Sequence, residues 1–245
     1  MSDGRVERSA YFDVACCPAN LSRLMAQLPG LIYAQRESTL YVGLFAASEA
    51  DVRIAGVPMK VTQRTGYPWT GEVAIALAPE RPIDLTLAIR IPGWARNEPV
   101  HTDLYRFADV SAERVALSVN RRPVPLTVQD GFATIRRRWR KGDVVDLTLP
   151  MPVRRVLAND AVADDRGRAA IQRGPIVYCV ESADNGPLGT LRLSLDAQFA
   201  HTFAPDLLNG VEAITSTADG RTITAVPYYA WNNRGRGEMA VWVPY

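Results

Sequence analysis

Beyond residue 31 the sequence is a succession of short runs of β-forming residues, and this pattern restricts the possible fold more than any other feature. The clearest runs are residues 40–45, 73–77, 85–91, 115–119, 132–135 and 144–149. Turn signals such as Asp130-Gly131 and Lys141-Gly142-Asp143 separate these runs. Short strands at this spacing, without intervening helices, are typical of an antiparallel β-sandwich. We therefore predict a mainly β fold.

A second set of such runs follows the Pro-Met-Pro sequence at residues 150–152. It includes residues 169–171, 176–180 and 239–243, and an acidic, turn-rich stretch at 159–167 lies before most of it. Periodicity alone does not distinguish two packed sandwich units from one sandwich with a long loop. We expect a β-sandwich over residues 34–155, and a second sandwich or a continuation of the first over residues 156–245.

Only the segment near the N-terminus has the periodicity of a helix. Its apolar residues recur at i, i+3, i+4 and i+7, namely Leu21, Leu24, Met25 and Leu28. Pro18 suits the first turn of a helix, and Pro29-Gly30 ends the run. We predict a helix of about three turns here, with an apolar face that has no helical partner elsewhere in the sequence.

Two adjacent cysteines, Cys16 and Cys17, lie at the start of this predicted helix. Neighbouring cysteines rarely form a structural disulfide, because the ring they close is far from the preferred disulfide geometry. A helix N-terminus offers unpaired N–H groups and a partial positive charge, which stabilise a thiolate. The pair therefore indicates a nucleophile, a metal ligand or both. The alternative interpretation is two small buried residues at a helix start.

Composition argues against several other classes of protein. The 245 residues include 28 Lys and Arg against 26 Asp and Glu, so the net charge of +2 indicates no polyanionic partner. We expect the one basic run, residues 136–141, to be the solvated face of a strand and no nucleic-acid site. The polar start lacks a secretory h-region, and no stretch approaches about 18 consecutive apolar residues. We expect a cytoplasmic protein with free thiols and no membrane partner.

The remaining candidate ligands and sugar-binding residues are weaker. Cys179 and Glu181 lie on one face of a predicted strand, and we expect Cys179 to be a small buried core residue. We expect the loop residues His101 and His201 to be surface residues and no metal ligands. Six aromatic residues could form sugar platforms, although core or interface packing is the favoured interpretation: Tyr67, Trp69, Trp94, Tyr228, Tyr229 and Trp231.

The segment that contains Cys16-Cys17-Pro18-Ala19-Asn20 resembles the Cys-Cys-Pro-x-Asn signature of glycoside hydrolase family 127, the β-L-arabinofuranosidase family. Five more segments resemble motifs of that family in the same order: residues 65–69 (TGYPW), 90–94 (RIPGW), 138–143 (RWRKGD), 172–178 (QRGPIVY) and 227–235 (PYYAWNNRG). Together they span essentially the whole chain. One departure is Arg121, which follows Asn120 where the family usually places the Gly of a type I′ hairpin.

The resemblance implies an (α/α)6 barrel followed by β-sandwich domains, with residues 1–33 as a remnant of the barrel. It implies that Cys16 is the nucleophile in the retaining hydrolysis of a terminal β-L-arabinofuranoside, and that Cys17 and Cys16 form a partial zinc site. The acid/base glutamate and a Glu-x-Cys element that completes the zinc site lie further upstream in the family. We therefore expect a fragment that is inactive alone and does not hold zinc stably.

Two readings from other functional classes stay open. One is a non-catalytic β-sandwich module that binds carbohydrate or a partner chain, such as a separately encoded barrel half. The other is a thiol-dependent zinc protein unrelated to sugars, which needs more ligands than the sequence offers. A truncated, split or mis-started reading frame would account for the glycosidase fragment, and the DNA upstream of Met1 distinguishes these cases.

Overall fold

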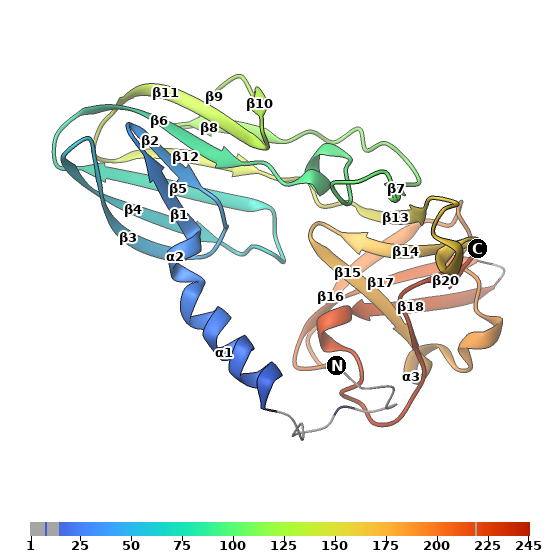
Figure 1. Ribbon diagram of the computed structural model, residues 1–245. Helices are drawn as coiled ribbons and strands as arrows, with labels where there is room; N and C mark the ends of the chain where they lie inside the picture. The colour runs from blue at the N-terminus through green and yellow to red at the C-terminus, as the bar shows by residue number, and fades with distance from the viewer. Residues whose placement is uncertain (1–7, 9–14, 219) are drawn as a thin grey trace. The chain divides into compact units, whose positions relative to one another are not determined.

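The computed structural model describes residues 8, 15–218 and 220–245, which form two compact units (Figure 1). The middle unit comprises residues 15–96 and 113–150, and the C-terminal unit comprises residue 8 with residues 97–112 and 151–245. Antiparallel sheets dominate both units, and there is one long helix. The predicted mainly β fold class is thereby confirmed. No helix in the described ranges is long and apolar enough to cross a bilayer.

The helices and strands of the middle unit are as follows: α1 (Cys16–Gln27), α2 (Pro29–Ile32), β1 (Tyr33–Arg36), β2 (Thr39–Val42), β3 (Ser48–Ile54), β4 (Val57–Thr65), β5 (Glu72–Pro79), β6 (Ile83–Arg90), the 3-10 turn η1 (Gly93–Arg96), β8 (Ala116–Val119), β9 (Arg122–Pro123), β10 (Val128–Gln129), β11 (Phe132–Trp139) and β12 (Asp143–Thr148).

Two sheets share one core in the middle unit. One sheet has the order β1-β2-β6-β11-β10 and the other β3-β4-β5-β12-β8-β9. Alternate residues of β4, β5 and β12 are buried, and residues from both sheets form a single apolar cluster. Trp139 of β11 is fully buried in this cluster, and its Nε1 donates to the Leu85 carbonyl at 3.1 Å. The middle unit is therefore a β-sandwich.

One pairing in this sandwich is parallel. Strands β2 and β6 run in the same direction, with Leu40 opposite Leu87 and Val42 opposite Ile89. The chain between them builds β3, β4 and β5 of the other sheet, so β6 returns to the first sheet in the direction of β2. All four residues are fully buried. The pairing therefore contributes its apolar residues to the core that the antiparallel strands also fill.

The turn from β8 to β9 contains the residue that departs from the family pattern. Asn120 and Arg121 both have positive φ, at 51° and 65°, as a two-residue type I′ hairpin requires. Asn tolerates this left-handed conformation, but an arginine carries the Cβ penalty that glycine avoids. Arg121 therefore holds the turn in the expected geometry at a conformational cost.

We expect Arg121→Gly to raise the free energy of unfolding by about 1 kcal/mol, because glycine adopts positive φ without the Cβ clash. Urea unfolding of the wild-type chain and the variant measures this change. Arg122→Gly is the matched control: it removes the neighbouring exposed arginine from strand β9, where glycine is unfavourable. An Arg121→Gly chain no more stable than the wild type would contradict the assignment of strain to this residue.

The predicted turn at residues 141–143, between β11 and β12, is hydrogen-bonded to the β8–β9 turn through Asp143. The Asp143 carboxylate accepts from the Arg140 backbone N–H at 2.8 Å and from Asn120 Nδ2 at 2.7 Å. Burial acts to raise the pKa of this carboxyl, but the two hydrogen bonds and the charges of Arg137 and Arg140 outweigh it and lower the pKa. Asp143 is therefore a buried anionic anchor between the β8–β9 and β11–β12 turns.

The C-terminal unit contains β7 (Tyr105–Phe107), β13 (Val153–Ala158), η2 (Ala163–Asp165), β14 (Arg168–Arg173), β15 (Ile176–Glu181), α3 (Ser182–Asn185), η3 (Leu188–Thr190), β16 (Phe199–Ala204), β17 (Val211–Ala218), β18 (Arg221–Pro227), η4 (Tyr228–Ala230), β19 (Met239–Ala240) and β20 (Val243–Pro244). Its sheet has the order β16-β17-β18-β15-β14-β13-β7, with β19 paired to β15 and β20 to β14. A separate apolar cluster that includes Tyr178, Leu193 and Ile214 forms its core.

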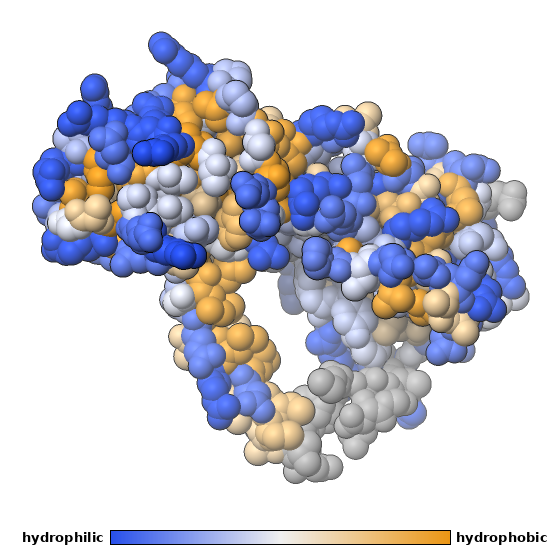
Figure 2. All heavy atoms as spheres, turned by 45° about the horizontal axis from the view of Figure 1, so that its top comes forward, coloured by the Kyte–Doolittle hydropathy of each residue, from blue (hydrophilic) through white to orange (hydrophobic). Residues whose placement is uncertain are grey.

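The predicted N-terminal helix is present as α1, and it begins at Cys16, so that the two cysteines lie within its first turn. None of its residues is buried, and Leu21 and Met25 are 60% and 58% exposed. Figure 2 shows apolar side chains gathered along this helix. The helix therefore presents the apolar face that its spacing predicts.

Candidate functional site

The two cysteines form the candidate site, and they are close together and exposed. The Sγ atoms of Cys16 and Cys17 are 3.8 Å apart, in the first turn of α1. The first-turn N–H groups of a helix point outward and carry partial positive charge. The N-cap, Ala15, makes no side-chain capping hydrogen bond to those groups, because its side chain is a methyl group. The arrangement can therefore support a thiolate nucleophile or a thiolate metal ligand.

The polar residues that follow the cysteines are engaged within the helix. Asn20, the last residue of the signature, accepts from Arg23 Nη1 through its Oδ1 at 3.0 Å. Ser22 Oγ donates to the carbonyl of Pro18 at 3.0 Å. Both contacts stay within the first two turns of α1.

The thiol pair fits zinc in spacing and in chemistry, but it supplies only two ligands. Tetrahedral zinc with Zn–S bonds of about 2.3 Å places two sulfurs about 3.8 Å apart. The Sγ separation of Cys16 and Cys17 equals that spacing. Within residues 8, 15–218 and 220–245, however, no three His, Cys, Asp or Glu side chains come together as a metal site. Two thiols are fewer than the three or four ligands of a stable zinc site, so the described residues do not complete one.

The structure gives the surroundings of the other candidate residues, Cys179, His101 and His201. Cys179 is buried, its Sγ lies 3.7 Å from the Val226 carbonyl, and burial raises the pKa of its thiol to about 12. Such a thiol is not reactive. His101 is exposed, and the exposed His201 has Nδ1 3.3 Å from Glu212 Oε2. Both histidines are exposed, as expected, but the loop prediction is wrong for His201, which lies on strand β16 and pairs with Ile214 of β17.

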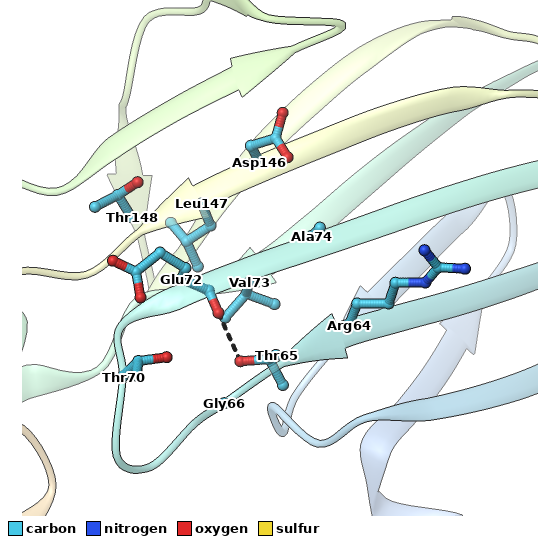
Figure 3. A pocket seen from close by; sticks show the side chains of 10 residues that line it. All are labelled: Arg64, Thr65, Gly66, Thr70, Glu72, Val73, Ala74, Asp146, Leu147 and Thr148. Atoms are coloured by element: carbon cyan, nitrogen blue, oxygen red, sulfur yellow. Dashed lines mark hydrogen bonds between the residues drawn. The ribbon is translucent and has the colours of Figure 1, made fainter.

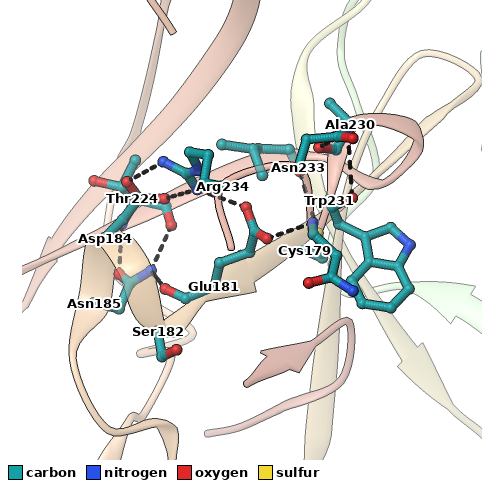
Figure 4. Close-up of polar contacts among 12 residues, drawn as sticks. Cys179, Glu181, Ser182, Asp184, Asn185, Thr224, Ala230, Trp231, Asn233 and Arg234 are labelled. Atoms are coloured by element: carbon teal, nitrogen blue, oxygen red, sulfur yellow. Dashed lines mark hydrogen bonds and ion pairs between the residues drawn. The ribbon is translucent and has the colours of Figure 1, made fainter. Parts of the chain in front are cut away.

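Glu181, which shares a strand face with Cys179, belongs to a polar cluster and not to a metal site (Figure 4). Its Oε1 accepts from the Asn232 backbone N–H at 2.6 Å, and its Oε2 lies 2.5 Å from Arg234 Nη2. Arg234 also makes two hydrogen bonds to Asp184, at 2.6 and 2.5 Å. The arginine of the PYYAWNNRG motif therefore joins the closing segment to β15 and α3.

Two further residues of this cluster, Asn185 and Arg221, were not predicted from the sequence. Asn185 Nδ2 donates to the carbonyls of Glu181 and Thr224, and its Oδ1 accepts from the Thr224 N–H at 2.9 Å. Arg221 Nη2 donates to the Asn185 carbonyl at 2.6 Å. The sequence offered one signal, the polar run at 181–185 immediately after the apolar strand 176–180. That run fastens β15 to β18.

The six aromatic candidates fall into two groups. Tyr67 and Trp94 pack against the core of the middle unit, and burial raises the pKa of the Tyr67 hydroxyl despite its hydrogen bond with Trp94. Trp231 stacks on Tyr228, with ring centroids 6.3 Å apart. The residues that stay about half exposed are Trp69 (51%), Tyr228 (45%) and Tyr229 (49%). The packing interpretation therefore holds for Tyr67 and Trp94, and the other aromatics retain accessible surface.

Two family models match most of the chain. The model described as "Beta-L-arabinofuranosidase, GH127 middle domain" matches residues 39–151, and the glycoside hydrolase family 127 C-terminal domain matches residues 153–244. A curated relative, the non-reducing end beta-L-arabinofuranosidase of Bifidobacterium longum subsp. longum, is 33% identical over 267 aligned positions, which cover 96% of this chain and 37% of the relative.

Solved structures agree with this assignment. A GH127 beta-L-arabinofuranosidase from Geobacillus stearothermophilus T6 is 39% identical with a TM-score of 0.85, covering 98% of this chain and 39% of that one. A second GH127 beta-arabinofuranosidase is 38% identical with a TM-score of 0.90, covering 97% of this chain and 40% of that one. The chain belongs to glycoside hydrolase family 127, and it corresponds to the C-terminal portion of these proteins. It spans about two-fifths of their length.

Proposed function

We propose that this chain is the thiol-bearing C-terminal portion of a retaining β-L-arabinofuranosidase-like glycoside hydrolase. The observation that carries the proposal is the pair of exposed thiols, 3.8 Å apart at the start of α1, within the signature that the family resemblance assigns to the reaction centre. Membership of the family supports a carbohydrate substrate with an arabinofuranoside at its end.

In the proposed reaction the Cys16 thiolate attacks the anomeric carbon. A carbon–sulfur bond forms as the glycosidic carbon–oxygen bond breaks, and a carboxylic acid protonates the departing oxygen. Water then hydrolyses the glycosyl thioether, with the same carboxylate now acting as base.

Cys17, together with Cys16, is the proposed thiolate half of a zinc site. When bound, zinc keeps a coordinating thiol deprotonated. The remaining ligands and the acid/base carboxylate come from polypeptide other than the described residues, as the family resemblance implies. We therefore propose that this chain alone holds zinc weakly and is inactive, and that it works in the reducing cytoplasm, where both thiols stay reduced.

The first test is the purified chain with an aryl β-L-arabinofuranoside and equimolar zinc. We expect no turnover above buffer, and complete loss of zinc to a chelator, because two thiolates are fewer than the three or four ligands of a stable site. Cys16→Ser and the neighbouring helix variant Ser22→Ala serve as a matched pair. Turnover by the chain that survives Ser22→Ala and disappears in Cys16→Ser would contradict inactivity of the isolated chain.

An oligosaccharide-binding assay with the same chain and variants tests the second candidate function, a non-catalytic module that binds carbohydrate or a partner chain. The half-exposed residues Trp69, Tyr228 and Tyr229 and the exposed apolar face of α1 favour it. Under this reading the chain binds arabinose-containing oligosaccharides without turnover, and replacing Trp69, Tyr228 and Tyr229 with alanine weakens that binding, whereas Cys16→Ser does not. Oligosaccharide binding that depends on Cys16 would instead support the reaction-centre proposal.

A further inference from the structure

The outer face of the middle unit carries a pocket that none of the proposed chemistry uses. It has a volume of about 370 Å³ and lies on strands β4, β5 and β12, beside the loop from β4 to β5 (Figure 3). No residue of α1 lines it. Most of its lining side chains are polar, and three are charged: Arg64, Glu72 and Asp146. It is therefore separate from the cysteine pair.

Strand register creates the hollow. Arg64, Ala74 and Asp146 lie opposite one another on three adjacent strands, on the face turned away from the core. The methyl group of Ala74 leaves a gap between the guanidinium on one side and the carboxylate on the other, as Figure 3 shows. The next outward row pairs Glu72 with Thr148, which closes one end of the gap.

Gly66 and Thr70 of the loop at residues 66–71 form one wall of this pocket, and hydrogen bonds hold the loop. Thr65 Oγ1 donates to the Glu72 carbonyl at 2.6 Å and accepts from the Tyr67 N–H at 3.0 Å. The Gly66 carbonyl accepts from the Trp69 and Thr70 N–H groups at 3.0 and 3.2 Å. The TGYPW motif therefore fixes the wall in advance, and a ligand need not order it on binding.

The chemistry of the lining selects a neutral polyhydroxy ligand. Arg64 only donates hydrogen bonds, the carboxylates of Glu72 and Asp146 only accept them, and the Thr70 and Thr148 hydroxyls do both. Vicinal hydroxyl groups satisfy donors and acceptors together. The two carboxylates against one guanidinium disfavour an anion. A divalent cation is disfavoured as well, because it needs more oxygen ligands than two carboxylates and sits poorly beside Arg64.

We propose that this pocket binds a neutral saccharide unit, as an accessory carbohydrate site separate from the cysteines. The sugar hydroxyls exchange hydrogen bonds with Arg64, Glu72 and Asp146, while its C–H face rests on Ala74. The site does not depend on the thiol chemistry, so Cys16→Ser leaves saccharide binding unchanged. Failure of the catalytic proposal and failure of this proposal are therefore distinguishable.

The test is an NMR titration of the full chain with L-arabinose. We expect amide shift changes confined to residues 64–66, 70–74 and 146–148. Ala74→Leu fills the hollow and should abolish these changes, whereas Ala76→Leu places the same side chain on the same face of β5, outside the lining, and should preserve them. Asp146→Ala should weaken binding roughly tenfold or more through loss of a charged acceptor, and Asp146→Asn by less.

Circular dichroism verifies that each variant is folded. If Ala74→Leu does not fold, the loss of binding in Asp146→Ala tests the proposal instead. Absent or dispersed shift changes in the wild-type chain would overturn the proposal, as would equal changes in Ala74→Leu and Ala76→Leu. A parallel titration with calcium chloride tests whether the pocket binds a divalent cation instead of a saccharide. Shifts of these amides with calcium but not with L-arabinose would replace the saccharide site by a cation site.

Discussion

Replacing Arg234 with alanine should lower the free energy of unfolding by about 3–5 kcal/mol, because the change leaves a buried charge without its partner. Arg234 bridges Glu181 and Asp184, and the Glu181 side chain is only 8% exposed. Hydrogen bonds with Asp184 and Glu181 raise the pKa of the guanidinium despite its partial burial, so it stays charged at all working pH values. In the variant, the Glu181 carboxylate loses this partner and keeps its hydrogen bond from the Asn232 N–H.

Urea unfolding of the full chain measures this effect. Arg236→Ala is the matched control, since it removes an exposed arginine two residues away and should change stability by less than about 0.5 kcal/mol. Arg234→Lys keeps the charge but loses the two-pronged contact with Asp184, so its loss should be intermediate. Equal stabilities of Arg234→Ala and Arg236→Ala would show that the closing motif does not fasten the C-terminal unit.

Replacing Gly71 with alanine should cost about 3 kcal/mol or more, because the added methyl group has no room. A Cβ at this position would lie 1.8 Å from the Leu149 carbonyl oxygen and 2.9 Å from its carbon. These are backbone atoms at the end of β12, and the Leu149 N–H donates to the Gly71 carbonyl at 2.9 Å. The two segments must separate to admit the methyl, which breaks that hydrogen bond and disturbs the wall of the saccharide pocket.

Thermal and urea unfolding of Gly71→Ala, compared with Gly30→Ala, isolate the effect of the close approach. Gly30 lies in α2 with no atom within 4 Å of an added Cβ, so alanine there should be neutral or stabilising. Amide shifts in Gly71→Ala should also change at residues 147–149. A Gly71→Ala chain as stable as Gly30→Ala would mean that the β4–β5 loop and the end of β12 are not in contact.

Local features of the fold followed from the sequence, and long-range pairings did not. The helical period at residues 21–28 corresponds to α1, and the Asp130-Gly131 turn forms a tight hairpin with both residues at positive φ. In contrast, the parallel pairing of β2 with β6 and the pairing of β7 with β13 join strands far apart in sequence. Period-2 patterns identify which face of a strand is buried, but they contain no information about its neighbour.

The functional residues were likewise predictable only where the signal is local in the sequence. The signature identified Cys16 and Cys17, and the burial of Cys179 followed from its apolar strand. The saccharide pocket was not visible in the sequence, because it depends on Arg64, Ala74 and Asp146 meeting in one row of three strands. In the sequence, Ala74 is an ordinary strand residue. Only the strand register, which places charged residues on both sides of it, shows that it lines a pocket.

The most direct test of the central claim, that Cys16 is the nucleophile of a reaction centre completed by other polypeptide, is a fusion protein. The part of the Bifidobacterium longum relative that precedes its aligned region would be joined to this chain and assayed with an aryl β-L-arabinofuranoside. The account predicts turnover, a glycosyl adduct on Cys16 detected by mass spectrometry, and loss of both in Cys16→Ser but not in Ser22→Ala. Undiminished turnover by the Cys16→Ser fusion would contradict it.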